Sequence, residues 1–371
     1  MHFGLFNLMQ MRDPATRPEE VYAHTLDMVK TADQAGFEMA WFAEHHFSTY
    51  SLCASPMVMA AWCAPQTKRI KLAPGVLLLP LYEPVRLVQE IGMLDIMSEG
   101  RFVLGLGTGY QPYEFERFKI DLKEGGDRYM EFLDIMELAL TQGEFAYRGR
   151  YYNYPEARIA IRTGRKFDPV YVAGVLNHPG IRKRTAERRY VPLLAPGWND
   201  ISLVERQLAA YRDVGRLVGT APADFPFSVM RFTHITDNRA DALAAAESFR
   251  YSTRVAVSLR FDYGKFTGTL PQDLPAKDEP SLEQIVDNCL IGSPEHCAAR
   301  IVAEIQSLTP FHYTLFMQCG AFDMAKSRRS LERFITEVMP LVRRALPDLD
   351  RIGGKPGALR TGIDYKLSAA Q

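Results

Sequence analysis

The segment AEHHF, residues 43–47, places a glutamate beside two histidines directly after a predicted β-strand. Imidazole titrates close to neutral pH, so a histidine at the mouth of an active site is a candidate acid/base group. Neighbouring residues of an extended chain point to opposite faces, so His45 and His46 are expected to meet different surroundings. This geometry, and the lack of an i, i+4 spacing, argue against a metal site formed by Glu44, His45 and His46. We predict that one histidine is catalytic and the other structural.

A glycine-rich segment, GRFVLGLGTGYQPYEF at residues 100–115, follows another predicted strand. Gly105, Gly107 and Gly109 lack the GxGxxG spacing of a nicotinamide-binding loop, and Gln111 and Pro112 separate them from any helix. Two interpretations remain open. The glycines either let a bulky planar ligand approach the backbone or form a tight turn.

Two further segments have unusual local sequences. Pro74 and Gly75 interrupt a predicted strand although both residue types weaken strands, which indicates either a functional distortion or a bulge without a catalytic role. The segment YVAGVLNHPG, residues 171–180, leaves a strand at Gly174 and enters a helix near Pro179. The free N–H groups and the dipole of a helix N-terminus suit a phosphate.

These segments must be positioned by alternating strands and helices. Short runs rich in Val, Leu, Phe and Tyr are each followed by helical periodicity, the pattern of βα units around a parallel sheet. The number of strands favours an α/β fold, a (β/α)8 TIM barrel with insertions, whose active site forms at the carboxyl ends of the strands. Helices are expected at 84–98, 127–141 and 325–346. The strands are expected at residues 2–8, 38–43, 70–79, 101–106, 169–173, 190–194, 227–235 and 313–318.

The rest of the chain consists of insertions and a tail. Residues 143–168 and 255–290 are predicted to be long irregular segments, and the second is a candidate lid over the active site. We predict one domain over residues 1–348 and a flexible tail over residues 349–371.

Composition argues against several classes of partner. The chain has 371 residues with 44 basic and 44 acidic side chains, so no net charge would attract nucleic acid or an anionic membrane. No run approaches the roughly 18 apolar residues that span a bilayer, and no secretory signal opens the chain. The five cysteines are scattered, which is typical of a reducing compartment. We therefore expect a cytoplasmic protein.

The four motifs, in this order, resemble those of the bacterial luciferase-like flavin-dependent monooxygenases. The resemblance covers residues 1–345 and is most specific in AEHHF, in LLPLYEPVRLVQEIGMLDIMSEGRFVLGLGTGY, and in the closing IGSPEHCAARI and FMQCGAFDMAKSRRSLERFITEVMPLVR. It implies a (β/α)8 barrel that forms a homodimer through its early helices. It also implies FMN over the barrel mouth, with the phosphate near the fifth βα loop.

Matched residue by residue, the resemblance makes His45 the catalytic histidine beside the flavin C4a atom. It makes Gly75-Val76 a cis peptide under the flavin ring. Thr108 stands where luciferase has an arginine for the phosphate, which implies weak binding of oxidised FMN. The predicted cofactor-binding residues are Phe6, Glu44, Gly75, Val76, Thr108, Tyr110, Ala173, Gly174, Val175, Leu176, Asn177 and His178.

The implied activity is that of a two-component monooxygenase without a metal. A separate NAD(P)H:FMN reductase would supply FMNH2, and O2 would form a C4a-peroxyflavin that oxygenates an apolar small molecule, a ketone or an aldehyde. Two alternatives remain: a deazaflavin-dependent oxidoreductase of the same superfamily, and a non-catalytic flavin-binding relative. Both histidines and a full set of strands argue against the second.

Overall fold

The computed structural model describes residues 2–161, 167–174, 178–217, 219, 225–320 and 322–353. Strands are present at all eight predicted positions, and the third is split in two at Gly75 and Val76. The strands are β1 (His2–Asn7), β2 (Met39–Phe42), β3 (Lys71–Pro74), β4 (Leu77–Leu78), β5 (Leu104–Gly107), β8 (Val170–Ala173), β9 (Val191–Leu194), β10 (Ser228–Ile235) and β14 (His312–Phe316).

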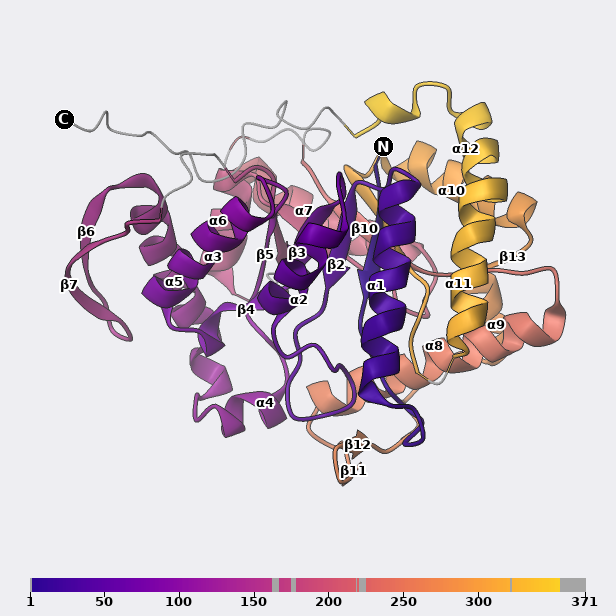
Figure 1. Cartoon of the computed structure of the whole chain (residues 1–371), viewed down its shortest axis with the longest axis horizontal. Helices are drawn as coiled ribbons and strands as arrows, with labels where there is room; N and C mark the ends of the chain where they lie inside the picture. The colour runs from indigo at the N-terminus through magenta and orange to yellow at the C-terminus, as the bar shows by residue number, and fades with distance from the viewer. Residues whose placement is uncertain are drawn as a thin grey trace.

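These strands form a nearly closed parallel barrel. Their order is β3-β2-β1-β14-β10-β9-β8-β5-β4, and a short strand, β13 (Leu290–Gly292), pairs with β10 outside this path. A parallel bridge between Leu72 of β3 and Phe102, just before β5, brings the two ends of the sheet together. Helices surround the strands (Figure 1). The predicted α/β barrel is confirmed.

Proline at the first helical position begins α1, α2, α3, α4, α6 and α10, where its fixed φ suits the helix and its missing N–H costs no hydrogen bond. A π-helical turn, Phe334–Val338, joins α11 to α12, so the helix predicted at 325–346 is nearly continuous. The helices are α1 (Pro18–Gln34), α2 (Pro56–Cys63), α3 (Pro84–Met97), α4 (Pro112–Arg117), α5 (Gly125–Thr141), α6 (Pro179–Arg188), α7 (Ser202–Leu217), α8 (Arg239–Arg260), α9 (Leu282–Asn288), α10 (Pro294–Leu308), α11 (Met324–Arg333) and α12 (Met339–Ala345).

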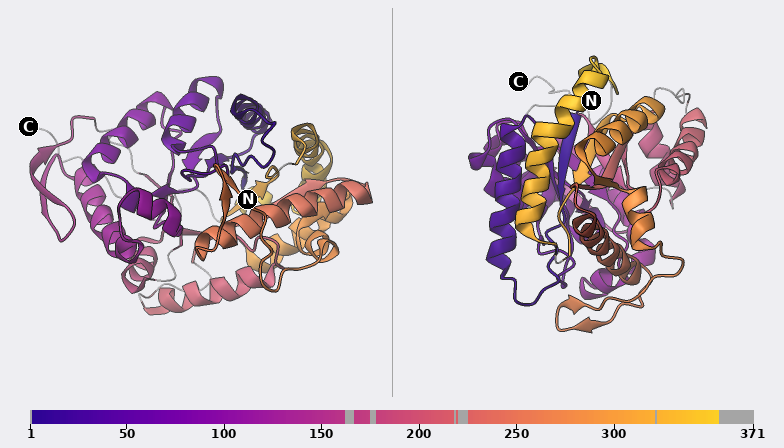
Figure 2. Two further views of the ribbon diagram at one scale, coloured as in Figure 1. Left: turned by 90° about the horizontal axis from the view of Figure 1, so that it is seen from below. Right: turned by 90° about the vertical axis from the view of Figure 1, so that its right-hand side faces the viewer.

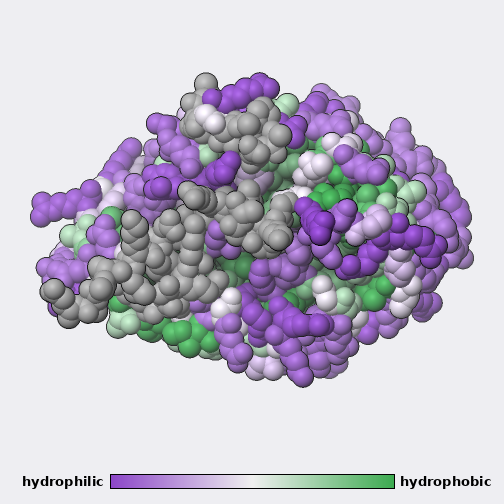
Figure 3. All heavy atoms as spheres, turned by 90° about the horizontal axis from the view of Figure 1, so that it is seen from above, coloured by the Kyte–Doolittle hydropathy of each residue, from purple (hydrophilic) through white to green (hydrophobic). Residues whose placement is uncertain are grey.

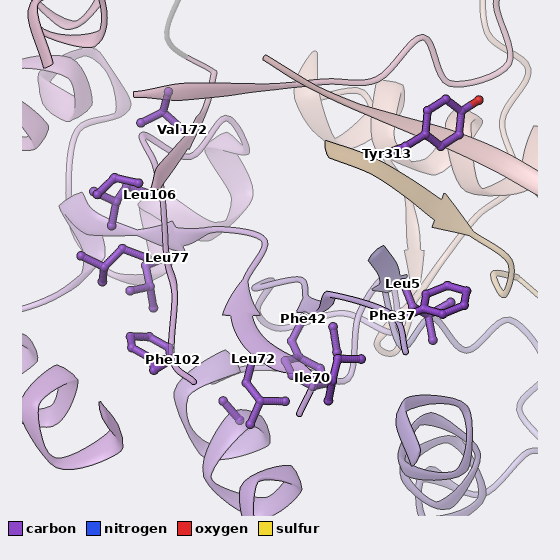
Figure 4. Packing of buried hydrophobic residues seen from close by; sticks show 14 of the residues in the cluster. Leu5, Phe37, Phe42, Ile70, Leu72, Leu77, Phe102, Leu106, Val172 and Tyr313 are labelled. Carbon is purple, nitrogen blue, oxygen red and sulfur yellow. The ribbon is translucent and has the colours of Figure 1, made fainter. Parts of the chain in front are cut away.

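Alternation along the strands divides the core into an outer and an inner part. Leu5, Leu72 and Tyr313 belong to the main core (Figure 4), which also contains apolar residues of the helices. Trp41 and Tyr171 belong to a smaller cluster and contact one another inside the barrel. Large rings therefore fill the barrel interior below its mouth.

The two insertions are more regular than predicted. Residues 143–168 contain an antiparallel hairpin of β6 (Glu144–Arg148) and β7 (Asn153–Arg158). The prediction of one long irregular stretch at 255–290 is wrong at both ends, because α8 continues to Arg260 and α9 occupies much of the other end. Buried Val255 and Leu259 extend the apolar face of α8, a signal masked by the Pro- and Asp-rich sequence that follows.

The carboxyl ends of the strands point to the lower side of Figure 1, where α4, α8 and a small hairpin lie. This hairpin consists of β11 (Phe266–Thr267) and β12 (Leu270–Pro271). Figure 2 shows α8 crossing this mouth of the barrel. On the opposite face, the described residues are mainly hydrophilic, with apolar residues between them (Figure 3).

The predicted boundary between the barrel domain and the C-terminal tail lies within the folded part of the chain. Leu349, where the tail was expected to begin, is buried in the main core. Residues 354–371 lie outside the described part of the chain. Within the described ranges, no helix combines the length and apolar character needed to cross a membrane.

Candidate functional site

His45 lies in the loop after β2, at the mouth of the barrel, and is largely buried. Its Nδ1 atom lies 3.1 Å from Glu114 Oε1 and 3.0 Å from Gln111 Nε2. Its backbone N–H donates to the carbonyl oxygen of Cys53 at 3.2 Å. Two side chains from the start of α4 therefore hold the imidazole, and neither was singled out from the sequence.

Glu114 is fully buried, and its contacts determine how His45 can act. Its Oε1 atom also accepts the backbone N–H of His46 at 2.8 Å. A buried carboxylate beside Nδ1 favours a proton on that nitrogen, which leaves Nε2 with the lone pair. Since Gln111 can turn either end of its amide to the ring, Glu114 decides the tautomer. No hydrogen-bond partner of Nε2 is found among the described residues, so this nitrogen is available to a reactant.

His46 forms a separate pair with Glu44. Its Nε2 atom lies 3.1 Å from Glu44 Oε1, while Glu44 Oε2 accepts the hydroxyl of Tyr82 at 2.9 Å and the N–H of Leu78 at 3.2 Å. Burial raises the pKa of Glu44, although these donors oppose the rise. The two imidazoles thus face different carboxylates, as the alternation predicted. In the described residues, no three His, Cys, Asp or Glu side chains are arranged to hold a metal ion.

The break between β3 and β4 forms part of the floor of the mouth. The Gly75-Val76 peptide is cis, as predicted. Gly75 donates its N–H to the carbonyl of Phe42 at 2.6 Å. A Cβ on Gly75 would lie 3.1 Å from Cε2 of Phe6, so the β1 ring lies against this peptide. Phe6 and Gly75 both keep accessible surface.

The glycines of β5 serve the packing of the protein itself. A Cβ on Gly105 would overlap the carbonyl oxygen of Pro74, and one on Gly107 would overlap Cγ2 of Val76. Gly109, at φ +74°, faces Phe115. The idea that these glycines make room for a planar ligand is therefore wrong for Gly105 and Gly107, because residues 74–76 occupy that space.

The predicted phosphate region lies where β5 and β8 end. A Cβ on Gly174 would lie 3.2 Å from the Thr108 hydroxyl oxygen, so the two loops meet, and Ala173 precedes them on β8. His178 caps α6, because its Nδ1 accepts the N–H of Ile181 at 3.3 Å, and its Nε2 lies 3.2 Å from Asp127. Both ring nitrogens of His178 are thus engaged within the protein. Val175, Leu176 and Asn177 lie outside the described residues.

Two tyrosines and an arginine complete the surroundings of His45. The rings of Tyr50 and Tyr110 lie 4.7 and 5.8 Å from the imidazole. The guanidinium carbon of Arg260 lies 4.5 Å from the centre of the Tyr110 ring. Burial raises the pKa of both phenols, so both remain hydrogen-bond donors. Only Tyr110 was predicted, since Arg260 fell in a stretch expected to be irregular.

The segment between α8 and α9 contacts several other segments at the mouth of the barrel. Phe266 of the β11–β12 hairpin stacks on Tyr113 at 4.4 Å, and Thr49 donates its N–H to the carbonyl of Thr269 at 2.9 Å. Asp273 lies within 3.1 Å of Arg12 and 3.0 Å of Arg254. The predicted lid segment is therefore in contact with three other parts of the mouth.

The inner wall of the mouth is apolar. Phe316 contacts Phe6 at 4.9 Å and Phe232 at 5.0 Å, measured between ring centres. Met230 is partly buried in the same cluster. A planar aromatic group on Phe6 and Gly75 would find apolar rings on one side and the polar pair of His45 and Glu114 at its edge. These residues fit a flavin ring.

Comparisons with known proteins identify the family and agree with the fold. Residues 1–310 match the family model described as luciferase-like monooxygenase. An uncharacterized protein of Sinorhizobium fredii is 31% identical over 93% of this chain and 99% of its own length. The oxygenase component of a flavin-dependent trigonelline monooxygenase from Acinetobacter baylyi is 22% identical over 92% of this chain and 95% of its own length.

Two solved structures show the same fold. The oxygenating constituent of 3,6-diketocamphane monooxygenase from Pseudomonas putida, a type II Baeyer–Villiger monooxygenase in complex with FMN, has a TM-score of 0.73 and 25% identity, covering 92% of this chain and 98% of its own. An F420-dependent secondary alcohol dehydrogenase has a TM-score of 0.67 and 16% identity, covering 92% of this chain and 99% of its own.

Proposed function

Because the chain belongs to the luciferase-like monooxygenase family and is a flavin-dependent monooxygenase by class, we propose that it oxygenates an apolar small molecule with FMNH2 and O2. The observation that carries this proposal is the His45–Glu114 pair, 3.1 Å apart. His45 lies in the loop that follows Phe42, whose carbonyl oxygen accepts the N–H of Gly75. An acid/base group at the mouth of a barrel with an apolar wall suits flavin chemistry.

We assign the flavin ring to the floor formed by Phe6, Gly75 and Val76, with Glu44 and Tyr110 at its border. Reduced flavin, when bound, supplies the electrons that activate O2. The phosphate would lie by Thr108, Ala173, Gly174 and the N-terminus of α6. His178 would contribute through the N-terminus of α6, because its imidazole is engaged.

His45 would hold or transfer a proton at the reacting oxygen through Nε2. Glu114 would hold the tautomer that leaves Nε2 without a proton, so that this nitrogen can accept a proton and return it. The apolar wall and the β11–β12 segment would exclude water, which otherwise diverts activated oxygen to H2O2.

The apolar wall suits a ketone or an aldehyde as substrate. Since one relative is named as an oxygenase component, a separate NAD(P)H:FMN reductase is proposed to supply FMNH2. A cytoplasmic location is part of the same proposal, because such a reductase and its nicotinamide are found there. A deazaflavin-dependent hydride transfer is the second candidate, since the fold is shared with an F420-dependent enzyme.

The test supplies the purified protein with FMNH2 and isotopically labelled O2 in the presence of a panel of apolar ketones and aldehydes. The proposal requires a product that carries one labelled oxygen atom and whose formation depends on FMNH2. Deazaflavin-dependent oxidation of an alcohol, with no oxygen incorporated, would instead establish the second candidate.

We also propose that the protein forms a homodimer through α2 and α3. Seven of the nine large apolar side chains exposed among the described residues lie on these helices or next to them: Phe47, Val58, Trp62, Met93, Ile96, Met97 and Phe118. A groove of about 560 Å³ runs between the two helices to the Glu44–His46 pair. Exposed apolar residues gathered on neighbouring helices mark an interaction surface, and most homodimers bury the same surface of both subunits about a twofold axis.

Sedimentation of an Ile96→Asp variant tests the dimer. The variant should be a folded monomer, whereas Phe261→Asp, a substitution at an exposed apolar residue elsewhere, should leave the dimer intact. A monomeric unmodified protein would contradict the proposal.

A further inference from the structure

Arg260 ends α8 at the mouth of the barrel, one ring away from the catalytic histidine. Its guanidinium lies 4.5 Å over the Tyr110 ring, and the same ring lies 5.8 Å from the His45 imidazole. The positive charge opposes the rise that burial causes in the pKa of Tyr50 and Tyr110, so its field reaches both phenols. Arg260 is therefore a positive charge one aromatic ring away from His45.

No carboxylate neutralises Arg260 within the described part of the chain, and the side chain is exposed. Glu114 acts on the same tyrosines but is already paired with His45. By contrast, Arg254, two turns earlier on α8, is bound by both Asp273 and Glu279. A positive charge at the C-terminus of a helix also interacts favourably with the helix dipole. That interaction does not explain why the guanidinium lies over the Tyr110 ring.

We propose that Arg260 binds an anionic group, a carboxylate or a phosphate monoester, carried by the organic substrate. This rests on the proposed function. The anion would lie at Arg260 and the apolar body of the substrate along the wall of Phe6, Phe232 and Phe316. The carbon to be oxygenated would then lie toward His45. The substrate class is thus narrowed to apolar ketones or aldehydes that also carry an acidic group.

The flavin phosphate is the other anion that could reach a cation at the mouth. Its proposed position is between the loops after β5 and β8, at Thr108 and Gly174, and no contact of Arg260 with either is found among the described residues. Arg260 instead stands over Tyr110, on the side of α8. The geometry therefore favours an anion of the substrate.

The test measures binding by calorimetry with saturating FMN present, so that it requires no turnover. The probes are octanoate, octyl phosphate and octan-1-ol, which share a chain and differ in charge. Arg260→Gln should weaken binding of both anions about tenfold or more, as expected for a lost charge-assisted contact, and leave octan-1-ol unchanged. Arg260→Lys should recover part of the loss. Arg239→Gln, at the exposed opposite end of α8, is the matched control.

Two results would overturn the proposal. The first is that the three probes respond equally to Arg260→Gln, which would make Arg260 a helix-terminal charge. The second is that Arg260→Gln weakens binding of FMN but not of riboflavin, and leaves the probes unchanged, which would assign Arg260 to the flavin phosphate. Anion binding that depends on Arg260, in a protein that fails to oxygenate with FMNH2, would instead overturn only the proposed function.

Discussion

His45 Nδ1 and Glu114 Oε1 lie 3.1 Å apart although 69 residues separate them in the chain. The barrel makes this contact, because β2 and β5 deliver both segments to the same mouth. A fully buried carboxylate beside Nδ1 determines which ring nitrogen carries the proton. The pair therefore links the fold directly to the proposed acid/base chemistry.

Glu114→Gln tests that link. The substitution keeps the shape and a hydrogen bond but removes the carboxylate that accepts the Nδ1 proton of His45. We expect the rate of oxygenation to fall about tenfold to a hundredfold while the affinity for FMNH2 changes little, because the amide no longer determines which ring nitrogen carries the proton. The rate of product formation and the affinity for FMNH2 are the two measurements. Glu116→Gln, at an exposed position of the same helix, should leave both unchanged, and an unchanged rate for Glu114→Gln would remove its positioning role.

Gly105→Ala tests the packing of β5 against residues 74–76. The new methyl group would overlap the carbonyl oxygen of Pro74, which is main chain and cannot rotate away. We expect the free energy of unfolding to fall by about 1–3 kcal/mol. Chemical denaturation measures it. Gly264→Ala is the control, because its nearest neighbours would lie at an ordinary 3.5 Å. Equal stability of the two variants would show that β3 and β5 are not packed this closely.

Thr108→Arg tests the phosphate position. The neutral hydroxyl lies beside Gly174, and the nearby Asp127 adds no attraction for an anion. We expect the unmodified protein to bind oxidised FMN weakly and the variant to bind it about tenfold more tightly, because a charge-assisted contact is gained. Riboflavin, which lacks the phosphate, should show no gain. Tight FMN binding by the unmodified protein would contradict the premise.

Because His312 is buried, we predict that the free energy of unfolding falls in acid. Burial lowers its pKa to about 3 from the usual 6.5, so the folded protein keeps it neutral while the unfolded chain takes up a proton. The stability it contributes is present above pH 6.5 and is lost as the pH falls toward 3. His312→Gln should therefore flatten the fall of unfolding free energy over this range, and His296→Gln, at an exposed position, should not. An equally steep fall in both variants would exclude His312 as a source.

The sequence predicted the strands well because their signals are local. Buried β-branched and aromatic runs such as residues 170–173 need no tertiary information to be recognised. The Gly75-Val76 peptide was predicted through a family resemblance, because no local rule marks a cis bond there. The extent of α8 was missed, because the sequence after it is rich in Pro and Asp.

The partners of His45 could not be predicted for a different reason. Gln111 and Glu114 are ordinary polar residues, and their roles depend on which strands and helices meet at the mouth. The same holds for Gly105, whose neighbour Pro74 lies on another strand. Sequence indicated which residues could do chemistry, whereas tertiary contacts determine which nitrogen is held and which is free.

The proposed oxygenation depends on His45 transferring a proton, whereas His46 has a structural role beside Glu44. The measurement is product formed per H2O2 released, at fixed FMNH2 supply, for His45→Ala and His46→Ala. We predict that His45→Ala remains folded and consumes FMNH2 but loses about 10²–10⁴-fold in oxygenation, releasing H2O2 instead. His46→Ala should keep the ratio and lose stability, because it leaves Glu44 buried without its partner. Uncoupling by His46→Ala and not by His45→Ala, or by neither, would contradict the account.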